Sequence, residues 1–87
     1  MATEQELEQQ IKDYIIKEFL YDKPAVTLDK DSLLIEEGII DSLGIFILIS
    51  FIDEEFKVKI EADEVLLENF ETLNAIKSLV MSKLNSN

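Results

Sequence analysis

The tripeptide Asp41-Ser42-Leu43 places one hydroxyl where a helix is predicted to begin. Asp41 is a good N-cap, so Ser42 is expected at the first helical position with its hydroxyl near solvent. Unpaired backbone N–H groups and the positive end of the helix dipole suit a phosphate bonded to that serine oxygen. A serine at a helix start is usually only a cap or a bystander, however, and the tripeptide alone is a weak signal.

The residue types that are missing exclude most enzyme mechanisms. The 87 residues contain no histidine and no cysteine. A Ser-His-Asp triad, an imidazole base, a thiolate nucleophile and the usual zinc sites are therefore excluded. We predict no catalytic residue and no metal site, and any thioester chemistry would need an imported thiol.

The charge is strongly one-sided, with 19 acidic residues, 8 lysines and a formal net charge of -11. Such a surface repels nucleic acid and anionic lipid and attracts proteins that carry Lys/Arg patches. The alternative is that the charge only confers solubility. Self-repulsion predicts in either case that salt raises the melting temperature.

A calcium site is the first alternative, because Asp29-Lys30-Asp31 begins like an EF-hand loop. The pattern then fails, since Leu34 replaces the required glycine and Ile40 replaces the bidentate glutamate. We reject an EF-hand, although weak binding of divalent cations by clustered carboxylates stays open.

The first predicted helix covers roughly residues 4–20. Thr3 and Glu6 have the spacing of a capping box, and apolar residues then recur at helical intervals. The residues before Pro24 should end this helix. The stretch 25–41 is long for a connection in a small domain, so its apolar residues are expected to pack onto the helices as an ordered loop, with one short turn near Ser32.

Two further long helices are predicted. One runs from Ser42 to about Phe56, and Thr72 caps the last one, whose apolar side extends to Leu84. Residues 57–61 are interpreted as an extended linker, and Asp63 to Leu67 as one or two helical turns. We therefore predict an all-α, small four-helix bundle with three longer helices and one short one, forming a single domain over 1–87 with an ordered core of about 4–84.

The residues before the first predicted helix form neither a basic nor an apolar segment, so no signal peptide is expected there. The longest apolar run, Leu43 to Ile52 with Ser50 inside it, is about half of a membrane span. We expect a cytoplasmic monomer that binds neither nucleic acid nor membrane.

Apolar residues surround the helix 42–56, and one side of a peripheral helix cannot bury them all. The stripe Leu48, Ile52 and Phe56 is assigned to the core, and some of the others should stay exposed. The predicted docking surface is apolar with an acidic rim and consists of Glu36, Glu37, Ile45, Ile47, Ile49, Asp53 and Glu54. The alternative is a tightly packed core helix.

Four segments together resemble the acyl and peptidyl carrier protein family. Residues 36–44 (EEGIIDSLG) resemble its attachment motif, and the apolar helix that follows, ending in IDEEF, resembles its second helix. The resemblance extends through 57–60, and 67–73 (LENFETL) looks like the short third helix and the start of the fourth. Nearly the whole chain is covered without a large insertion.

The resemblance implies a carrier that catalyses nothing itself. A phosphopantetheinyl transferase would move a phosphopantetheine arm from coenzyme A to Ser42, with Asp41 and Leu43 as the neighbouring cofactor-binding residues. Asp41 would also orient the transferase or its metal ion. The thiol of the arm would hold acyl or aminoacyl groups as thioesters, loaded by an adenylating or acyl-transferring enzyme and delivered to a downstream synthase or transferase.

The chain departs from the fatty-acid-type pattern, which usually has acidic residues at the positions of Gly44 and Ile47. Docking through the usual salt bridges is therefore not expected. We predict a free-standing carrier in nonribosomal peptide, polyketide or related biosynthesis. The alternatives are a fatty acid synthesis carrier and an acidic interaction module that kept the bundle but carries no arm.

Overall fold

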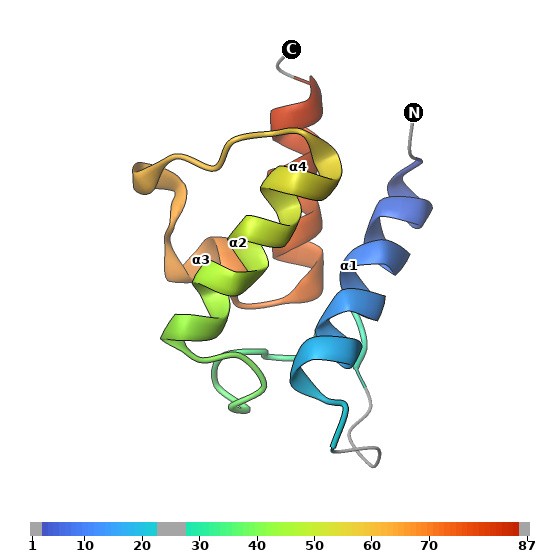
Figure 1. The fold of residues 1–87 in the computed structure, drawn as a ribbon, viewed down its shortest axis with the longest axis vertical. Coiled ribbons are helices and arrows are strands. Elements are labelled where there is room, and N and C mark those ends of the chain that lie inside the picture. The colour runs from blue at the N-terminus through green and yellow to red at the C-terminus, as the bar shows by residue number, and fades with distance from the viewer. Residues whose placement is uncertain (1–2, 23–27, 86–87) are drawn as a thin grey trace.

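Every regular element in residues 3–22 and 28–85, which the computed structural model describes, is a helix (Figure 1). The elements are α1 (Glu4–Phe19), α2 (Ser42–Phe56), the 3-10 turn η1 (Ala62–Glu64), α3 (Leu67–Phe70) and α4 (Leu73–Asn85). The predicted all-α bundle of three longer helices and one short helix is confirmed. Pro24 lies outside the described residues, so its part in ending α1 stays a prediction.

The helix α1 begins at the predicted capping box and packs mainly against α4. The Glu6 N–H donates to Thr3 Oγ1 at 3.1 Å, and the Thr3 N–H donates to Glu6 Oε1 at 3.3 Å. Three residues at helical spacing then enter the core with no exposed area, namely Leu7, Ile11 and Ile15. These caps and this stripe are local features, which explains why the helix could be predicted closely.

The connection between α1 and α2 is ordered over its described part, as predicted. The Ser32 N–H donates to Asp29 O at 3.2 Å, which forms the expected turn. The Leu34 N–H donates to Glu71 O at 2.8 Å and so ties the loop to the residue after α3. Leu34 and Ile40 are buried. The loop therefore forms part of the core and holds the residues that precede α2.

The short helical turns between α2 and α4 correct one prediction. The helical turns expected over Asp63 to Leu67 are present in part: Asp63 and Glu64 belong to η1 and Leu67 begins α3, but Val65 and Leu66 between them are not helical. The family resemblance at 67–73 located α3 correctly. Burial of Phe70 explains its position, since that ring is 1% exposed and anchors the turn against the core.

The linker after α2 is extended, as predicted. Val58 and Ile60 are buried while Lys57 and Lys59 are exposed. Side chains thus alternate between core and solvent as in a strand, although this segment pairs with no other strand among the described residues. Lys57 ends α2 in the left-handed conformation at φ 57°. No helix in the described part of the chain is long and apolar enough to cross a membrane.

Candidate functional site

Ser42 is the first residue of α2 and is exposed, as the sequence predicts. Asp41 starts the helix: its backbone is extended at φ -100° and ψ -174°, and its Oδ1 accepts from the Gly44 N–H at 2.7 Å. The Ile45 N–H donates to Asp41 O at 3.0 Å, closing the first helical turn. A side-chain cap of this kind places the next residue at the helix start, with its side chain outside the turn.

Two backbone donors remain beside the serine hydroxyl. Among the described residues nothing accepts a hydrogen bond from the amides of Ser42 and Leu43, since the Asp41 carboxylate takes the Gly44 amide. The first turn of α2 contains no acidic side chain. The free amides and the positive end of the helix dipole therefore favour an anion bonded at this point. Repulsion from the exposed Asp41 carboxylate is weakened by solvent and salt.

The loop before Asp41 is held by one carbonyl. Leu34 O accepts from the Ile39 N–H at 2.8 Å and from the Ile40 N–H at 3.0 Å. Ile40, two residues before Ser42, is 1% exposed. The approach to the serine is thus supported from the core side, while the hydroxyl itself faces outward.

The exposed side of α2 is apolar in the half that follows Ser42. Leu43 is 69% exposed, Phe46 60% and Ile47 40%. We call these three residues the α2 apolar surface. No charged residue lies between Ser42 and Ile52, although the chain carries a net charge of -11. A helix in so acidic a protein would be expected to carry charge on its solvent side, so this surface is unusual for a purely structural helix.

The predicted docking residues divide into two groups. Glu36, Glu37, Ile47 and Glu54 are exposed, while Ile45, Ile49 and Asp53 are half-buried. Ile45 and Ile49 pack against the core, and Leu48, Ile52 and Phe56 are buried as predicted.

Two of the predicted acidic residues also have structural contacts. Asp53 Oδ1 accepts from the Ile60 N–H at 3.2 Å, which ties the linker to the end of α2. Glu37 Oε2 accepts from the Leu33 N–H at 3.2 Å, within the loop. Only their remaining acceptor capacity can serve a partner.

Phe46 is exposed but is not part of the predicted docking surface. Phe46 follows Ser42 by four residues, so the two share one side of the helix. That spacing was the available signal.

The side of α2 that faces α1 is covered by aromatic rings. Tyr14 and Phe51 stack with their ring centroids 3.9 Å apart and their planes at 11°. Burial raises the pKa of the Tyr14 phenol, and the Glu18 and Glu54 carboxylates add to the effect. Nearer to Ser42, Gly44 is buried against Phe19. The absence of an acidic residue at position 44 is therefore not a missing surface charge, since a side chain there would meet α1.

A small hollow of about 160 Å³ lies between the loop and α3, lined by Leu33, Ile35, Glu36, Leu67 and Glu71. Leu67 at its edge is 63% exposed, and Leu66 beside it is 46% exposed. Exposed apolar side chains thus occur on α3 as well as on α2.

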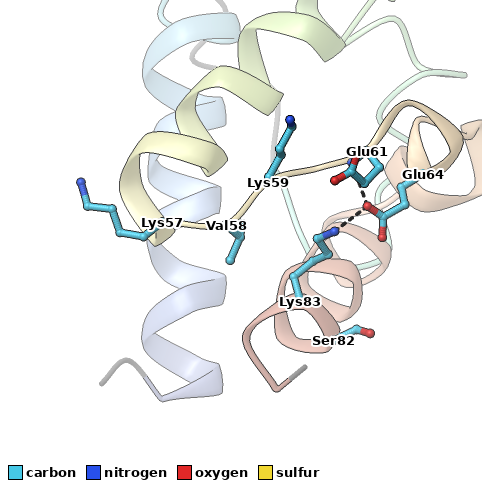
Figure 2. A pocket seen from close by; sticks show the side chains of 7 residues that line it. All are labelled: Lys57, Val58, Lys59, Glu61, Glu64, Ser82 and Lys83. Atoms are coloured by element: carbon cyan, nitrogen blue, oxygen red, sulfur yellow. Dashed lines mark hydrogen bonds and ion pairs between the residues drawn. The ribbon is translucent and has the colours of Figure 1, made fainter. Parts of the chain in front are cut away.

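A second hollow, of about 350 Å³, lies at the far end of the bundle, about 20 Å along α2 from Ser42 at 1.5 Å per residue. Figure 2 shows Lys83 directed toward Glu64 there, and Lys83 Nζ lies 2.7 Å from Glu64 Oε1. The hydrogen bond from Lys83 lowers the pKa of Glu64, and the same bond raises the pKa of Lys83. The pair joins η1 to α4, and we assign this hollow a structural role.

The chain is similar in sequence to a protein whose family is given by its name. The chain is 36% identical over 74 residues to a probable acyl carrier protein, PigG, of Serratia sp. (strain ATCC 39006), and the match covers 85% of this chain and 84% of that protein. No family model matches the chain.

Proposed function

Since this chain belongs to the acyl carrier protein family, we propose that Ser42 carries a phosphopantetheine arm whose thiol holds acyl or aminoacyl groups as thioesters. The observation that supports the arm is the exposed Ser42 hydroxyl at the start of α2, beside two amides without acceptors. When bound, the arm would supply the thiol that the cysteine-free chain lacks. The protein would supply the attachment point and the surface that partners recognise, and would catalyse no step itself.

The residues around Ser42 fit such a group. The amides of Ser42 and Leu43 would donate to the phosphate of the arm, and the dipole of α2 would favour its negative charge. Asp41 would keep the first turn closed through its bond to the Gly44 amide. During attachment the Ser42 oxygen would form a bond to phosphorus and lose its proton, and the nucleotide part of coenzyme A would leave.

The α2 apolar surface supports a docking role beside the attachment point. Partners would be a phosphopantetheinyl transferase, a loading enzyme and a downstream synthase or transferase. An apolar centre with Glu36, Glu37 and Glu54 around it fits a partner with an apolar patch and basic residues at the edge.

Exposed Ile47, at a position that is usually acidic in fatty-acid-type carriers, supports nonribosomal peptide, polyketide or related biosynthesis over fatty acid synthesis. An assay of acyl and aminoacyl loading on the armed protein by adenylating enzymes would test that assignment. Loading by fatty acid synthesis enzymes alone would contradict it.

Intact-mass measurement tests the arm itself. The chain is incubated with coenzyme A and a broad-specificity phosphopantetheinyl transferase, and we expect the mass of one phosphopantetheine to be added. Ser42→Ala should accept none, while Ser50→Ala, which alters another exposed serine of α2, should accept one. An adduct that persists in Ser42→Ala would contradict the proposal, and a chain that accepts no arm would support an unmodified interaction module.

A further inference from the structure

Gly44 is a glycine in a place where the backbone does not require one. It lies in the first turn of α2, and its φ is outside the left-handed region, unlike that of Gly38 at φ 75°. Glycine is among the least favourable residues inside a helix because it has the most conformational freedom to lose. A reason for glycine must therefore come from its surroundings.

The surroundings leave no room for a side chain. A Cβ at residue 44 would lie 2.9 Å from Phe19 Cε1, 3.0 Å from Ile40 Cγ2 and 3.2 Å from Asp41 Oδ1. The end of α1, the loop and the N-cap thus meet at one Cα atom. The Asp41 carboxylate can cap the Gly44 amide while the Phe19 ring lies against the same residue.

This contact lies almost opposite the reactive hydroxyl. At roughly 3.6 residues per turn, Ser42 and Gly44 are on nearly opposite sides of the helix. Phe19 is the last residue of α1 and is half-buried, whereas Ser42 is exposed. The ring therefore supports the first turn from behind and does not itself occupy the space in front of the serine.

We propose that Phe19 is a positioning residue for Ser42: its ring, seated on Gly44, holds the first turn of α2 so that the hydroxyl and the two free amides face the transferase on the side away from α1. This inference rests on the proposed attachment of the arm to Ser42. The first turn of a helix has few backbone bonds of its own, so an outside contact has a large effect on its order.

A set of four variants separates positioning from simple packing. Phe19→Leu removes the ring edge, Gly44→Ala adds the colliding Cβ, and the double variant does both, so the two changes compensate in volume. Tyr14→Leu is the matched control, because it removes another aromatic contact between α1 and α2, at Phe51. Each protein is assayed for Tm and for kcat/KM of arm transfer.

We expect kcat/KM to fall about tenfold in Phe19→Leu and in Gly44→Ala, since a small misplacement of a reacting group is costly. The double variant should return to within about threefold of the wild type, because the two sites are in direct contact and their effects are coupled. Tyr14→Leu should lower Tm and leave kcat/KM unchanged. Equal losses in Phe19→Leu and Tyr14→Leu at equal Tm shifts would overturn the inference, as would a double variant without recovery.

Amide hydrogen exchange provides a readout that needs no transferase. In unmodified Phe19→Leu, the Gly44 and Ile45 amides should exchange about tenfold faster than in the wild type, while the Ile52 amide is unchanged. If the Gly44 and Ile45 amides of Phe19→Leu exchange at the same rates as those of the wild type, the inference is overturned. If the wild type accepts no arm, the proposed function fails, and the exchange rates still decide whether Phe19 orders the first turn.

Discussion

The helices α1 and α2 have nearly the same length, 16 and 15 residues, and both place one stripe in the core, but their exposed sides differ. The solvent side of α1 is mainly charged or carries amide groups, with Ile16 at 39% exposure as an exception. That of α2 carries Leu43, Phe46 and Ile47. A solvated bundle gains nothing from exposing an apolar surface, so the difference separates residues that the fold needs from residues that a partner would use.

The two ends of α2 also differ in whether their side chains serve the fold or are open to solvent. At the far end, Asp53 binds the linker and Phe56 is buried, so the side chains there serve the fold. At the near end, Ser42 and Leu43 contribute little to the core and are open to solvent. The support for that end comes from residues behind it, namely Phe19 and Ile40.

The largest expected effect is a loss of stability when a core residue of α1 is truncated. Ile11→Ala should lower the free energy of unfolding by about 2–5 kcal/mol, because a fully buried side chain leaves a cavity. Phe46→Ala on α2 should cost no more than about 0.5 kcal/mol, since its ring is mostly exposed. Urea unfolding measures both. A comparable loss at Phe46 would show that the α2 apolar surface is structural.

The next largest effect is expected on the rate of arm transfer and not on stability. Phe46→Ser should lower kcat/KM for arm transfer about tenfold, as expected of a central aromatic residue in a docking surface. Ile16→Ser, which removes an exposed apolar side chain from α1, should leave that rate unchanged. Equal rates for the wild type and Phe46→Ser would place the docking surface elsewhere.

A smaller effect is expected where α1 meets α4. Lys77 Nζ lies 2.8 Å from Glu8 Oε1 and 3.1 Å from Glu4 Oε1, and Lys77→Met should cost about 0.2–1 kcal/mol in urea unfolding at neutral pH.

The ion pair of Lys77 with Glu8 predicts that stability depends on pH. The hydrogen bond from Lys77 lowers the pKa of Glu8 below its ordinary value of 4.5, so the folded state binds this proton less readily than the unfolded state. The contribution of Glu8 is therefore present above pH 4.5 and lost as the pH falls through the lowered value. The difference in stability between the wild type and Lys77→Met should shrink in that range. A difference that stays constant with pH would show that the ion pair of Lys77 with Glu8 does not contribute to stability.

The smallest effect concerns the whole surface. Raising the salt concentration should raise the Tm of the wild type by a few degrees, because screening reduces repulsion within a chain of net charge -11. The gain should be largest at low ionic strength and should level off as the Debye length becomes short. A Tm that falls with salt would mean that ion pairs such as Lys77 with Glu8 outweigh the repulsion.

Features that depend on residues three or four apart could be predicted from the sequence. Asp41 caps α2 by its bond to Gly44, and the Ala75 N–H donates to Thr72 Oγ1 at 3.0 Å at the start of α4. Ser42 lies next to such a cap, so its position followed from its immediate neighbours. The turns between α2 and α4 could not be placed by the same means. Their positions depend on the burial of Phe70, which is decided by packing against distant segments of the chain.

The sequence was enough to predict where the three longer helices begin, that Ser42 stands first in α2, and that the chain has no thiol or imidazole of its own. Which apolar residues of α2 stay exposed, and that Phe19 covers Gly44, could be seen only in the folded chain. Caps and periodicity act within one turn, whereas burial depends on segments that are distant along the chain and meet only after folding.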